Sequence, residues 1–253
     1  MNRILTLILC AAIPATGLGS GAMMFDGVDD YANMGNVPNL GTEDFTISGW
    51  INVEDLSLNN VFIVKYQDAD NRFYFTQIPG GSLIFYAEDS NIIKARADSD
   101  SGLISENKWT HIVAVGKSGV STTIYANGVD VTSSKSYIAH TGGDILNTGS
   151  FNLGNYNDGI YMKGQIDEVL IYNRFLEASE VEAMHASSGA WYPKTGLVSR
   201  WSMDKNGIST GNPHPNGSTV KDSAGSNDGI IVDGADSSMV LTSSPVRKKR
   251  GRR

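Results

Sequence analysis

The sequence predicts an all-β fold, and two kinds of observation support this. Stretches rich in β-branched and aromatic residues recur at roughly ten-residue spacing without a helical pattern between them. Turn sequences separate them, including Pro79-Gly80-Gly81, Asp68 to Asn71 and the hairpin dipeptide Asn127-Gly128. Strands connected in this way fold as a sandwich or a barrel. The expected strands are 45–51, 61–66, 72–78, 82–88, 92–97, 109–116, 121–126, 129–133 and 151–156.

A further strand is expected at Gly164–Arg174, and its composition makes it central. Alternation places Ile166, Leu170 and Tyr172 on one face and Val169 and Ile171 on the other, so both faces are covered. The carboxylates Asp167 and Glu168 are expected near its start, at the solvent-exposed rim of the sheet. A Ser179 to Glu182 capping box then predicts one short helix near 179–187.

Charge is unevenly distributed along the 253 residues. Six of the 20 basic residues lie in the last seven positions, and the remaining 14 face 27 acidic residues. An acidic body disfavours nucleic acid as a partner, so only the basic tail at 246–253 is a candidate for contact with phosphates. The alternative for this tail is a solvated end of the chain.

The first 22 residues have the pattern of a secretory signal peptide. Arg3 precedes an apolar run from Ile4 to Ala15, and small residues follow up to Ala22. The run is too short to span a bilayer, so no transmembrane segment is expected. Cys10 is the single cysteine, which excludes an intrachain disulfide. The alternative is an uncleaved apolar arm that packs on the sandwich or on a neighbouring subunit.

Three ordered motifs resemble one family. The runs are FDGVDDY at 25–31, WTHIVAVGKSGVSTTIYANG at 109–128 and GQIDEVLIYNRFLEASEV at 164–181. Together they resemble the laminin-G-like, concanavalin A-like jelly-roll modules. The resemblance implies a two-sheet antiparallel jelly-roll sandwich over residues 23–188. Modules of this family bind sugars, bind proteins or serve a structural role, so the fold alone does not fix the function.

Calcium is the cofactor that the aspartates suggest. Asp26, Asp29 and Asp30 lie within five residues, and carboxylate oxygens are ligands that calcium prefers. In the family that the chain resembles, the first and last strands are neighbours, which implies that Asp167 completes the set. The alternative is that these aspartates accept backbone hydrogen bonds at a turn.

Ligand contacts are expected at one end of the sandwich and on strand faces. In lectin-like and pentraxin-like relatives the loops at this end carry such contacts, which implies roles for Asn155, Tyr156 and Asp158. Tyr66, Tyr74 and Tyr86 are candidate stacking platforms, because an aromatic face packs on sugar C–H groups. The alternative is half-buried packing, since strands favour tyrosine.

The C-terminal part repeats a feature of the family. Gly196–Asp204 and Val220–Ala235 resemble a segment that precedes the first strand in many members, but here they follow the closing strand. A fragment of this size cannot bury its own core. Residues 189–245 are therefore expected to dock on the same sandwich, as permuted strands or as a truncated second module.

Catalytic patterns are weak in this sequence. Glucanases of the same fold carry alternating carboxylates on one strand, whereas here Glu43-Asp44, Glu54-Asp55 and Glu88-Asp89 are adjacent pairs whose side chains point to opposite faces. His111 lies among apolar residues and is expected to be a hydrogen-bonded core histidine.

These observations favour a non-catalytic module of a secreted or surface protein that binds a glycan or a protein ligand. A structural protein of a virion or surface layer, with self-assembly contacts, and a glycoside hydrolase are the alternatives.

Overall fold

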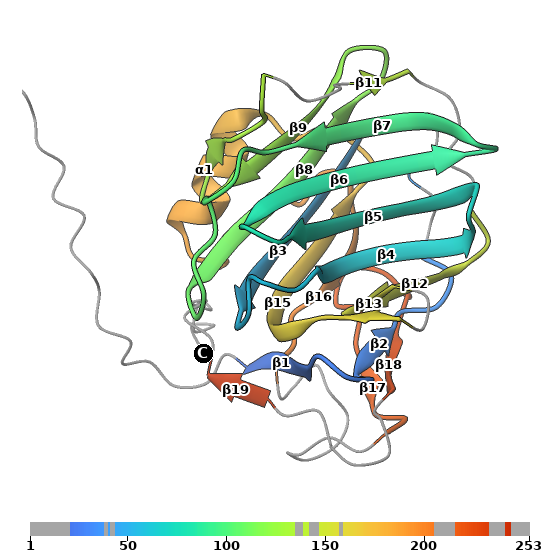
Figure 1. Cartoon of the computed structure of the whole chain (residues 1–253), viewed down its shortest axis with the longest axis vertical. Helices are drawn as coiled ribbons and strands as arrows, with labels where there is room; N and C mark the ends of the chain where they lie inside the picture. The colour runs from blue at the N-terminus through green and yellow to red at the C-terminus, as the bar shows by residue number, and fades with distance from the viewer. Residues whose placement is uncertain are drawn as a thin grey trace, which may run out of the picture.

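The protein is a two-layer β-sandwich with one short helix among the residues that the structure describes, which confirms the predicted jelly-roll class (Figure 1). The computed structural model describes residues 21–37, 40, 44–134, 139–141, 147–156, 159–204, 216–232 and 241–243. Most of the expected signal segment, the basic tail and Asp158 lie outside these ranges. Gly21 and Ala22 are described, and they form the start of the first strand.

The rear layer in Figure 1 is an eight-stranded antiparallel sheet. Its order is β10 (Val129–Asp130), β9 (Ser121–Ala126), β8 (Trp109–Lys117), β3 (Phe45–Val53), β15 (Lys163–Tyr172), β1 (Gly21–Asp26) and β19 (Leu241–Ser243), with β16 (Leu197–Trp201) also paired to β15. The return strand expected at 129–133 is thus only two residues long, and Val131 to Ser133 continue without strand structure apart from an isolated bridge at Thr132.

The front layer is a nine-stranded antiparallel sheet. Its order is β11 (Ala139–His140), β7 (Ile92–Asp98), β6 (Ser82–Asp89), β5 (Asn71–Ile78), β4 (Asn60–Asp68), β12 (Ser150–Leu153), β2 (Tyr31–Asn33), β18 (Gly229–Val232) and β17 (Thr219–Val220). A separate two-stranded hairpin consists of β13 (Asn155–Tyr156) and β14 (Ile160–Tyr161).

The main core lies between the two layers. Alternate residues of the front sheet, such as Phe73, Phe75 and Phe85, point inward and pack in one cluster with Phe45 and Ile51 of the rear sheet. The period of two in β5 and β6 then sends the intervening side chains to the outer face. That outer face is the surface on which the candidate site lies.

A β-bulge in β15 changes the predicted facing of one residue. Glu168 has φ +49°, and the register with β3 shifts between Asp167 and Leu170. The extra residue reverses the alternation. Ile166 therefore joins Val169 and Ile171 in the main core, rather than sharing a face with Leu170 and Tyr172 as predicted.

Contrary to the prediction, the two carboxylates are not at the solvent-exposed rim, because β15 starts at Lys163 and places them in its middle. Asp167 and Glu168 are fully buried in the middle of β15. Asp167 accepts a hydrogen bond at Oδ1 from the backbone N–H of Glu168, at 2.7 Å. Glu168 forms a two-point ion pair with Arg200 on the neighbouring β16, at 2.7 and 2.9 Å.

The helix α1 (Ala178–Ala186) begins one residue earlier than the sequence suggested. Glu177 is its N-cap, and its backbone N–H donates to Glu180 Oε2 at 3.0 Å, so the predicted cap at Ser179 is wrong. The helix packs Val181 and Met184 on Leu170 and Tyr172, which covers part of the outer face of the rear sheet. In the described part of the chain, no helix is long and apolar enough to cross a membrane.

C-terminal strands pair with both layers. β16 extends the rear sheet beside β15, and β18 pairs with β2 of the front sheet. Trp201 is fully buried in the main core, and its indole N–H donates to Asn227 O at 2.8 Å. Asp222 fixes the loop before β18, because its carboxylate accepts backbone N–H groups from Arg200, Ala224, Gly225 and Asn227.

Breaking the buried Glu168–Arg200 ion pair should destabilise the protein much more than breaking the exposed Lys221–Asp228 pair. Arg200→Met leaves the fully buried Glu168 carboxylate without its cation, so we expect the free energy of unfolding to fall by about 3 kcal/mol. Lys221→Met is the control, since the exposed Lys221–Asp228 pair contributes less than about 1 kcal/mol. Urea denaturation measures both, and equal losses would contradict the role assigned to the buried pair.

Candidate functional site

Four tyrosines named from the sequence gather on the outer face of the front sheet. Tyr66, Tyr74 and Tyr86 occupy neighbouring strands β4, β5 and β6, and their registers place Tyr74 directly opposite Tyr86. Tyr156 approaches the same face from the β13–β14 hairpin. Because β4 to β6 alternate, these rings point away from the core that Phe73 and Phe85 fill.

The rings form one contiguous cluster. Tyr74 and Tyr86 stack with centroids 5.2 Å apart and an interplanar angle of 17°. Tyr156 meets Tyr74 edge-on at 5.7 Å and Tyr66 edge-on at 5.4 Å. Stacked and edge-on contacts of this kind fix the ring positions. The face is therefore a preformed aromatic surface.

The hairpin that carries Tyr156 exists because the chain turns away from β12 at Gly154. This glycine has φ +85°, and a Cβ there would lie 2.5 Å from the ring of Phe25. Met162 N–H donates to Gly154 O at 2.8 Å and closes the base of the hairpin. Glycine is required at this position by both the conformation and the close approach.

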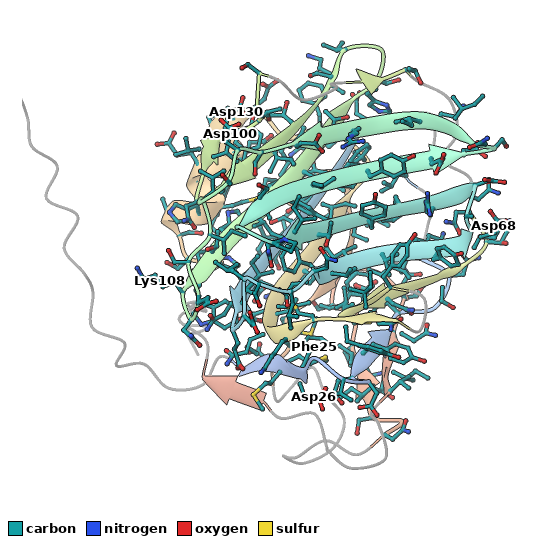
Figure 2. The ribbon with its side chains drawn as sticks, in the orientation of Figure 1. Phe25, Asp26, Asp68, Asp100, Lys108 and Asp130 are labelled. Carbon is teal, nitrogen blue, oxygen red and sulfur yellow. The ribbon has the colours of Figure 1, made fainter. Side chains whose placement is uncertain are left out.

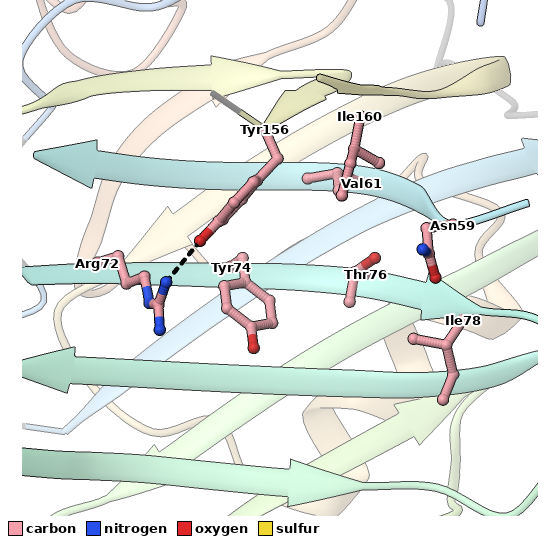
Figure 3. A pocket seen from close by; sticks show the side chains of 8 residues that line it. All are labelled: Asn59, Val61, Arg72, Tyr74, Thr76, Ile78, Tyr156 and Ile160. Atoms are coloured by element: carbon pink, nitrogen blue, oxygen red, sulfur yellow. Dashed lines mark hydrogen bonds between the residues drawn. The ribbon is translucent and has the colours of Figure 1, made fainter. Parts of the chain in front are cut away.

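Arg72 anchors the hairpin to the sheet. Its Nη1 donates to Tyr156 Oη at 2.9 Å, so the tyrosine extends from the hairpin across β4 to β5 (Figure 3). Its Nη2 lies 3.2 Å from Glu88 Oε2 on β6. The guanidinium also lies 5.8 Å from the centroid of the Tyr86 ring, which adds a cation–π contact.

A cavity of about 240 Å³ lies between the hairpin and the sheet. Val61 of β4 and Tyr74, Thr76 and Ile78 of β5 contribute from the sheet, while Tyr156 and Ile160 contribute from the hairpin (Figure 3). Asn59 and Arg72 complete the lining. None of these described lining residues carries a carboxylate, so they do not supply the pair of carboxyl groups that glycosidases use.

Charges beside the cavity are balanced. Glu88 lies beside Arg72, and Asp98 accepts two-point hydrogen bonds from Arg96 at 3.1 and 3.2 Å. Burial raises the pKa of Tyr74 to about 12, and it also raises the pKa of Tyr86. Both phenols are therefore neutral hydrogen-bonding groups at physiological pH.

Sequence reasoning found the tyrosines but missed the other lining residues. Arg72, Thr76 and Ile78 share the face of Tyr74 through the period of two in β5, and that alternation was the available signal. Asn59 and Ile160 carried no such signal, because they come from a loop end and from a hairpin two residues per strand in length.

Of the predicted ligand residues that the structure describes, Tyr74 and Tyr156 line this cavity, whereas Tyr66, Tyr86 and Asn155 do not. Asn155 is buried, and it precedes Tyr156 on an extended segment, so its side chain leaves on the other side of the strand. Asp158 lies outside the described residues, in the connection between β13 and β14. The tyrosines are thus brought together, and Asn155 is not.

The structure also brings together three of the four aspartates proposed as metal ligands. One carboxylate oxygen each from Asp26, Asp29 and Asp30 lies within 4.8 Å of the others. Figure 2 places Asp26 next to Phe25 in β1, near an edge of the sandwich. Within the cluster, Asp30 Oδ2 accepts the Asp26 N–H at 3.2 Å and Asp26 Oδ1 accepts the Val28 N–H at 2.7 Å.

Asp167 is distant from this cluster. Asp26 pairs with Lys163 on β15, so Asp167 lies four residues farther along the strand, or roughly 13 Å at 3.3 Å per residue. In the pairing of β15 with β3, Asp167 lies opposite Trp50.

A buried serine–histidine pair lies on the other face of the rear sheet. Ser48 Oγ and His111 Nε2 are 2.9 Å apart, and His111 stacks with Trp50 and His185, with ring centroids 5.0 and 6.1 Å away. His111 is buried, and this burial lowers its pKa to about 3. A base of such low pKa and no access to solvent does not activate a nucleophile, so the pair is a hydrogen-bonded part of the interior, as expected for His111.

A family model described as the concanavalin A-like lectin/glucanases superfamily matches residues 26–182. Among curated protein sequences, none matches the chain.

Solved structures share the fold at low sequence identity. A protein of Bacteroides ovatus, named for a proposed carbohydrate-binding role, is 15% identical with a TM-score of 0.63 over 88% of this chain and 60% of that protein. A heptameric SAP-like pentraxin from Limulus polyphemus is 18% identical with a TM-score of 0.52 over 71% and 87%. The CBM40 of a Ruminococcus gnavus IT-sialidase, bound to α2,3-sialyllactose, is 12% identical with a TM-score of 0.52 over 66% and 98%. The chain thus spans less than two thirds of the Bacteroides ovatus protein.

The buried His111 predicts acid sensitivity. In the unfolded chain this histidine binds a proton near pH 6.5, whereas in the folded protein its pKa is about 3. The contribution to stability is therefore complete above pH 6.5 and is lost as the pH falls toward 3, by up to about 1.4 kcal/mol per pH unit.

Replacement by an amide removes this titration. We expect His111→Gln to show a flatter fall in the free energy of unfolding between pH 6.5 and 5 than the parent protein, measured by urea denaturation at each pH. His185→Gln is the comparison, since His185 is only partly buried, and burial lowers its pKa in the same direction. An unchanged slope in His111→Gln would show that this histidine does not set the acid sensitivity.

Proposed function

This chain belongs to the concanavalin A-like lectin/glucanases superfamily, and we propose that it is a non-catalytic module that binds carbohydrate at the tyrosine-rich face of the front sheet. The observation that carries the proposal is the cavity between the β13–β14 hairpin and β4–β5, in which two tyrosine rings adjoin aliphatic side chains and a few polar groups. Such a surface stacks on the C–H face of a sugar ring, while Arg72, Thr76 and Asn59 meet its hydroxyl groups.

Preorganisation supports this assignment. Tyr156 is held by a hydrogen bond and by two edge-on ring contacts, so a ligand would not have to order it. Binding then avoids the entropy that an otherwise free side chain loses. The carbohydrate-binding names of two structural neighbours are consistent with this function, although at 12–15% identity they show only a shared fold.

Of the two alternatives, the hydrolase is less well supported. The described lining of the cavity consists of apolar, aromatic, amide, hydroxyl and guanidinium groups. A glycosidase positions two carboxyl groups on either side of the scissile bond. A structural role in a virion or surface layer would use contacts between copies, and a sugar-binding face is not needed for it.

Export is part of the proposal. The N-terminal pattern of Arg3, an apolar run and small residues is typical of a secretory signal, and extracellular glycans are the natural ligands of such a module. We therefore place the protein at the cell exterior.

The aromatic face predicts the effect of removing one ring. Tyr156→Ala deletes the hairpin side of the cavity, and we expect it to weaken binding of any glycan identified on a glycan array by at least about tenfold, since alanine substitution of a buried aromatic anchor costs 2 kcal/mol or more. Isothermal titration calorimetry measures the change. Tyr31→Ala is the control, because Tyr31 is equally half-buried on the same sheet but does not line the cavity. Equal losses in both variants would refute the site.

We also propose a calcium ion at the aspartate cluster. Three carboxylates whose oxygens lie within 4.8 Å repel one another, and a divalent cation would relieve this repulsion. Asp26, Asp29 and Asp30 would hold it together with backbone oxygens and water. Its position near β1 suggests a role in stability, away from the tyrosine face.

Calcium binding predicts a rise in the melting temperature. At a calcium concentration 100 times the dissociation constant, stability increases by about 2.7 kcal/mol. We expect this increase in the parent protein and its absence in Asp29→Asn, measured by thermal denaturation in calcium and in chelator. Asp130→Asn, a replacement at an exposed aspartate outside the cluster, should keep the calcium response. The same melting temperature with and without calcium in the parent protein would rule out the ion.

A further inference from the structure

The cavity under the hairpin has a polar end and an aliphatic half. At one end the Arg72 guanidinium meets the Tyr156 hydroxyl (Figure 3). Beyond Tyr74 and Thr76, the other half contains the aliphatic groups of Val61, Ile78 and Ile160, together with Asn59 (Figure 3). A ligand that fills this cavity must therefore present a polar group toward Arg72 and an apolar group toward the aliphatic side chains.

The cavity is small and opens to solvent. Its volume of about 240 Å³ suits one sugar ring with its substituents, and further sugar units would extend over the rim.

Polar capacity beside these aliphatic groups is small. The single Thr76 hydroxyl proton points to the backbone oxygens of Asn60 and Gln77, at 3.0 and 3.2 Å, so toward a ligand this hydroxyl serves as an acceptor. Val61, Ile78 and Ile160 themselves offer no donor or acceptor, so a ligand hydroxyl placed against them would lose water, which costs free energy. A methyl group at the same place gains from the transfer out of water.

Charge does not favour an anionic sugar. Glu88 Oε2 lies 3.2 Å from Arg72 Nη2, and Asp98 forms an ion pair with Arg96. Each of these two guanidinium groups therefore already has a carboxylate partner. A uronate or other carboxylate ligand would compete with these partners and would meet an acidic protein. Among the described lining residues, the Tyr156 hydroxyl and the Asn59 amide are neutral groups, and they suit a hydroxyl or carbonyl oxygen of an uncharged sugar.

We propose that the cavity selects a neutral pyranose that carries a methyl group, placed against Val61, Ile78 and Ile160. Two classes of sugar supply this chemistry: a 6-deoxyhexose, through its C6 methyl, and a 2-acetamido sugar, through its acetyl methyl. The proposal rests on the carbohydrate-binding function proposed above, and it adds the class of sugar.

The test uses two matched pairs of sugars on the full chain. L-Fucose and L-galactose differ only by a methyl against a hydroxymethyl group. N-acetylglucosamine carries an acetamido group where glucose has a hydroxyl group, and D-glucuronate serves as the anionic sugar. Calorimetric or NMR titration gives the dissociation constants. We expect the methyl-bearing member of one pair to bind about tenfold or more tightly than its partner, and that pair identifies the source of the methyl group.

Variants assign this preference to the aliphatic residues. Ile160→Ser and Ile78→Ser replace partly exposed residues of the lining, and we expect each to reduce the preference to less than threefold while the fold is retained by circular dichroism. Ile230→Ser is the control, since Ile230 is exposed on β18 of the same sheet but does not line the cavity. It should keep the full preference.

The outcomes separate the two proposals. Equal affinities within both pairs, tighter binding of D-glucuronate than of the neutral sugars, or a preference that survives both lining variants would overturn the methyl selectivity and leave carbohydrate binding standing. Failure of every sugar in the pairs and on a glycan array to bind would overturn both.

Discussion

Burial of β15 on both faces is the constraint on which the rest of the structure depends. One face contributes Ile166, Val169 and Ile171 to the core between the sheets, and the other places Leu170 and Tyr172 under the helix α1. A strand covered on both sides has no surface on which to leave an unpaired charge. The buried Glu168 carboxylate therefore requires a cation, which Arg200 provides. The Glu168–Arg200 ion pair connects the C-terminal strand β16 to the centre of the rear sheet.

The outer faces of the two sheets differ in how accessible they are to solvent. The outer face of the rear sheet is partly covered by α1 and contains a buried aromatic and histidine stack. The outer face of the front sheet carries half-buried tyrosines and paired charges. Only the second arrangement combines fixed rings with access to solvent, which is what recognition of a sugar needs. The candidate site therefore lies on the front sheet, because the outer face of the rear sheet is partly covered by α1.

The sequence predicted the strands well because their signal is local. Period-two alternation and turn residues such as Asn127-Gly128 depend on neighbours in the chain, and most strand limits were right within two residues. It failed at β15, where one extra residue reverses the faces, because a bulge changes register without changing composition. The helix start was misplaced because Arg174 recruits Glu180, and Glu180 in turn caps Glu177.

The candidate site was predictable in part for the same reason. The tyrosines could be named as surface aromatics, but their convergence depends on the register of β4 to β6 and on a hairpin that returns over them. Asp167 was expected beside Asp26 because the first and last strands pair. The pairing does occur, yet its register sets the two residues four positions apart. Knowing that two strands are neighbours does not show which of their residues are opposite each other, because that depends on the register.

Packing and recognition are not competing explanations for these tyrosines. The edge-on contacts of Tyr156 with Tyr66 and Tyr74 stabilise the hairpin, and they also fix one side of the cavity. Removing the ring would therefore affect both the stability of the hairpin and the shape of the cavity. The aliphatic lining separates the two roles, because Ile78 and Ile160 line the cavity, are partly exposed and carry no ring. Selectivity among sugars, rather than affinity for one, is therefore the property through which this face reveals its function.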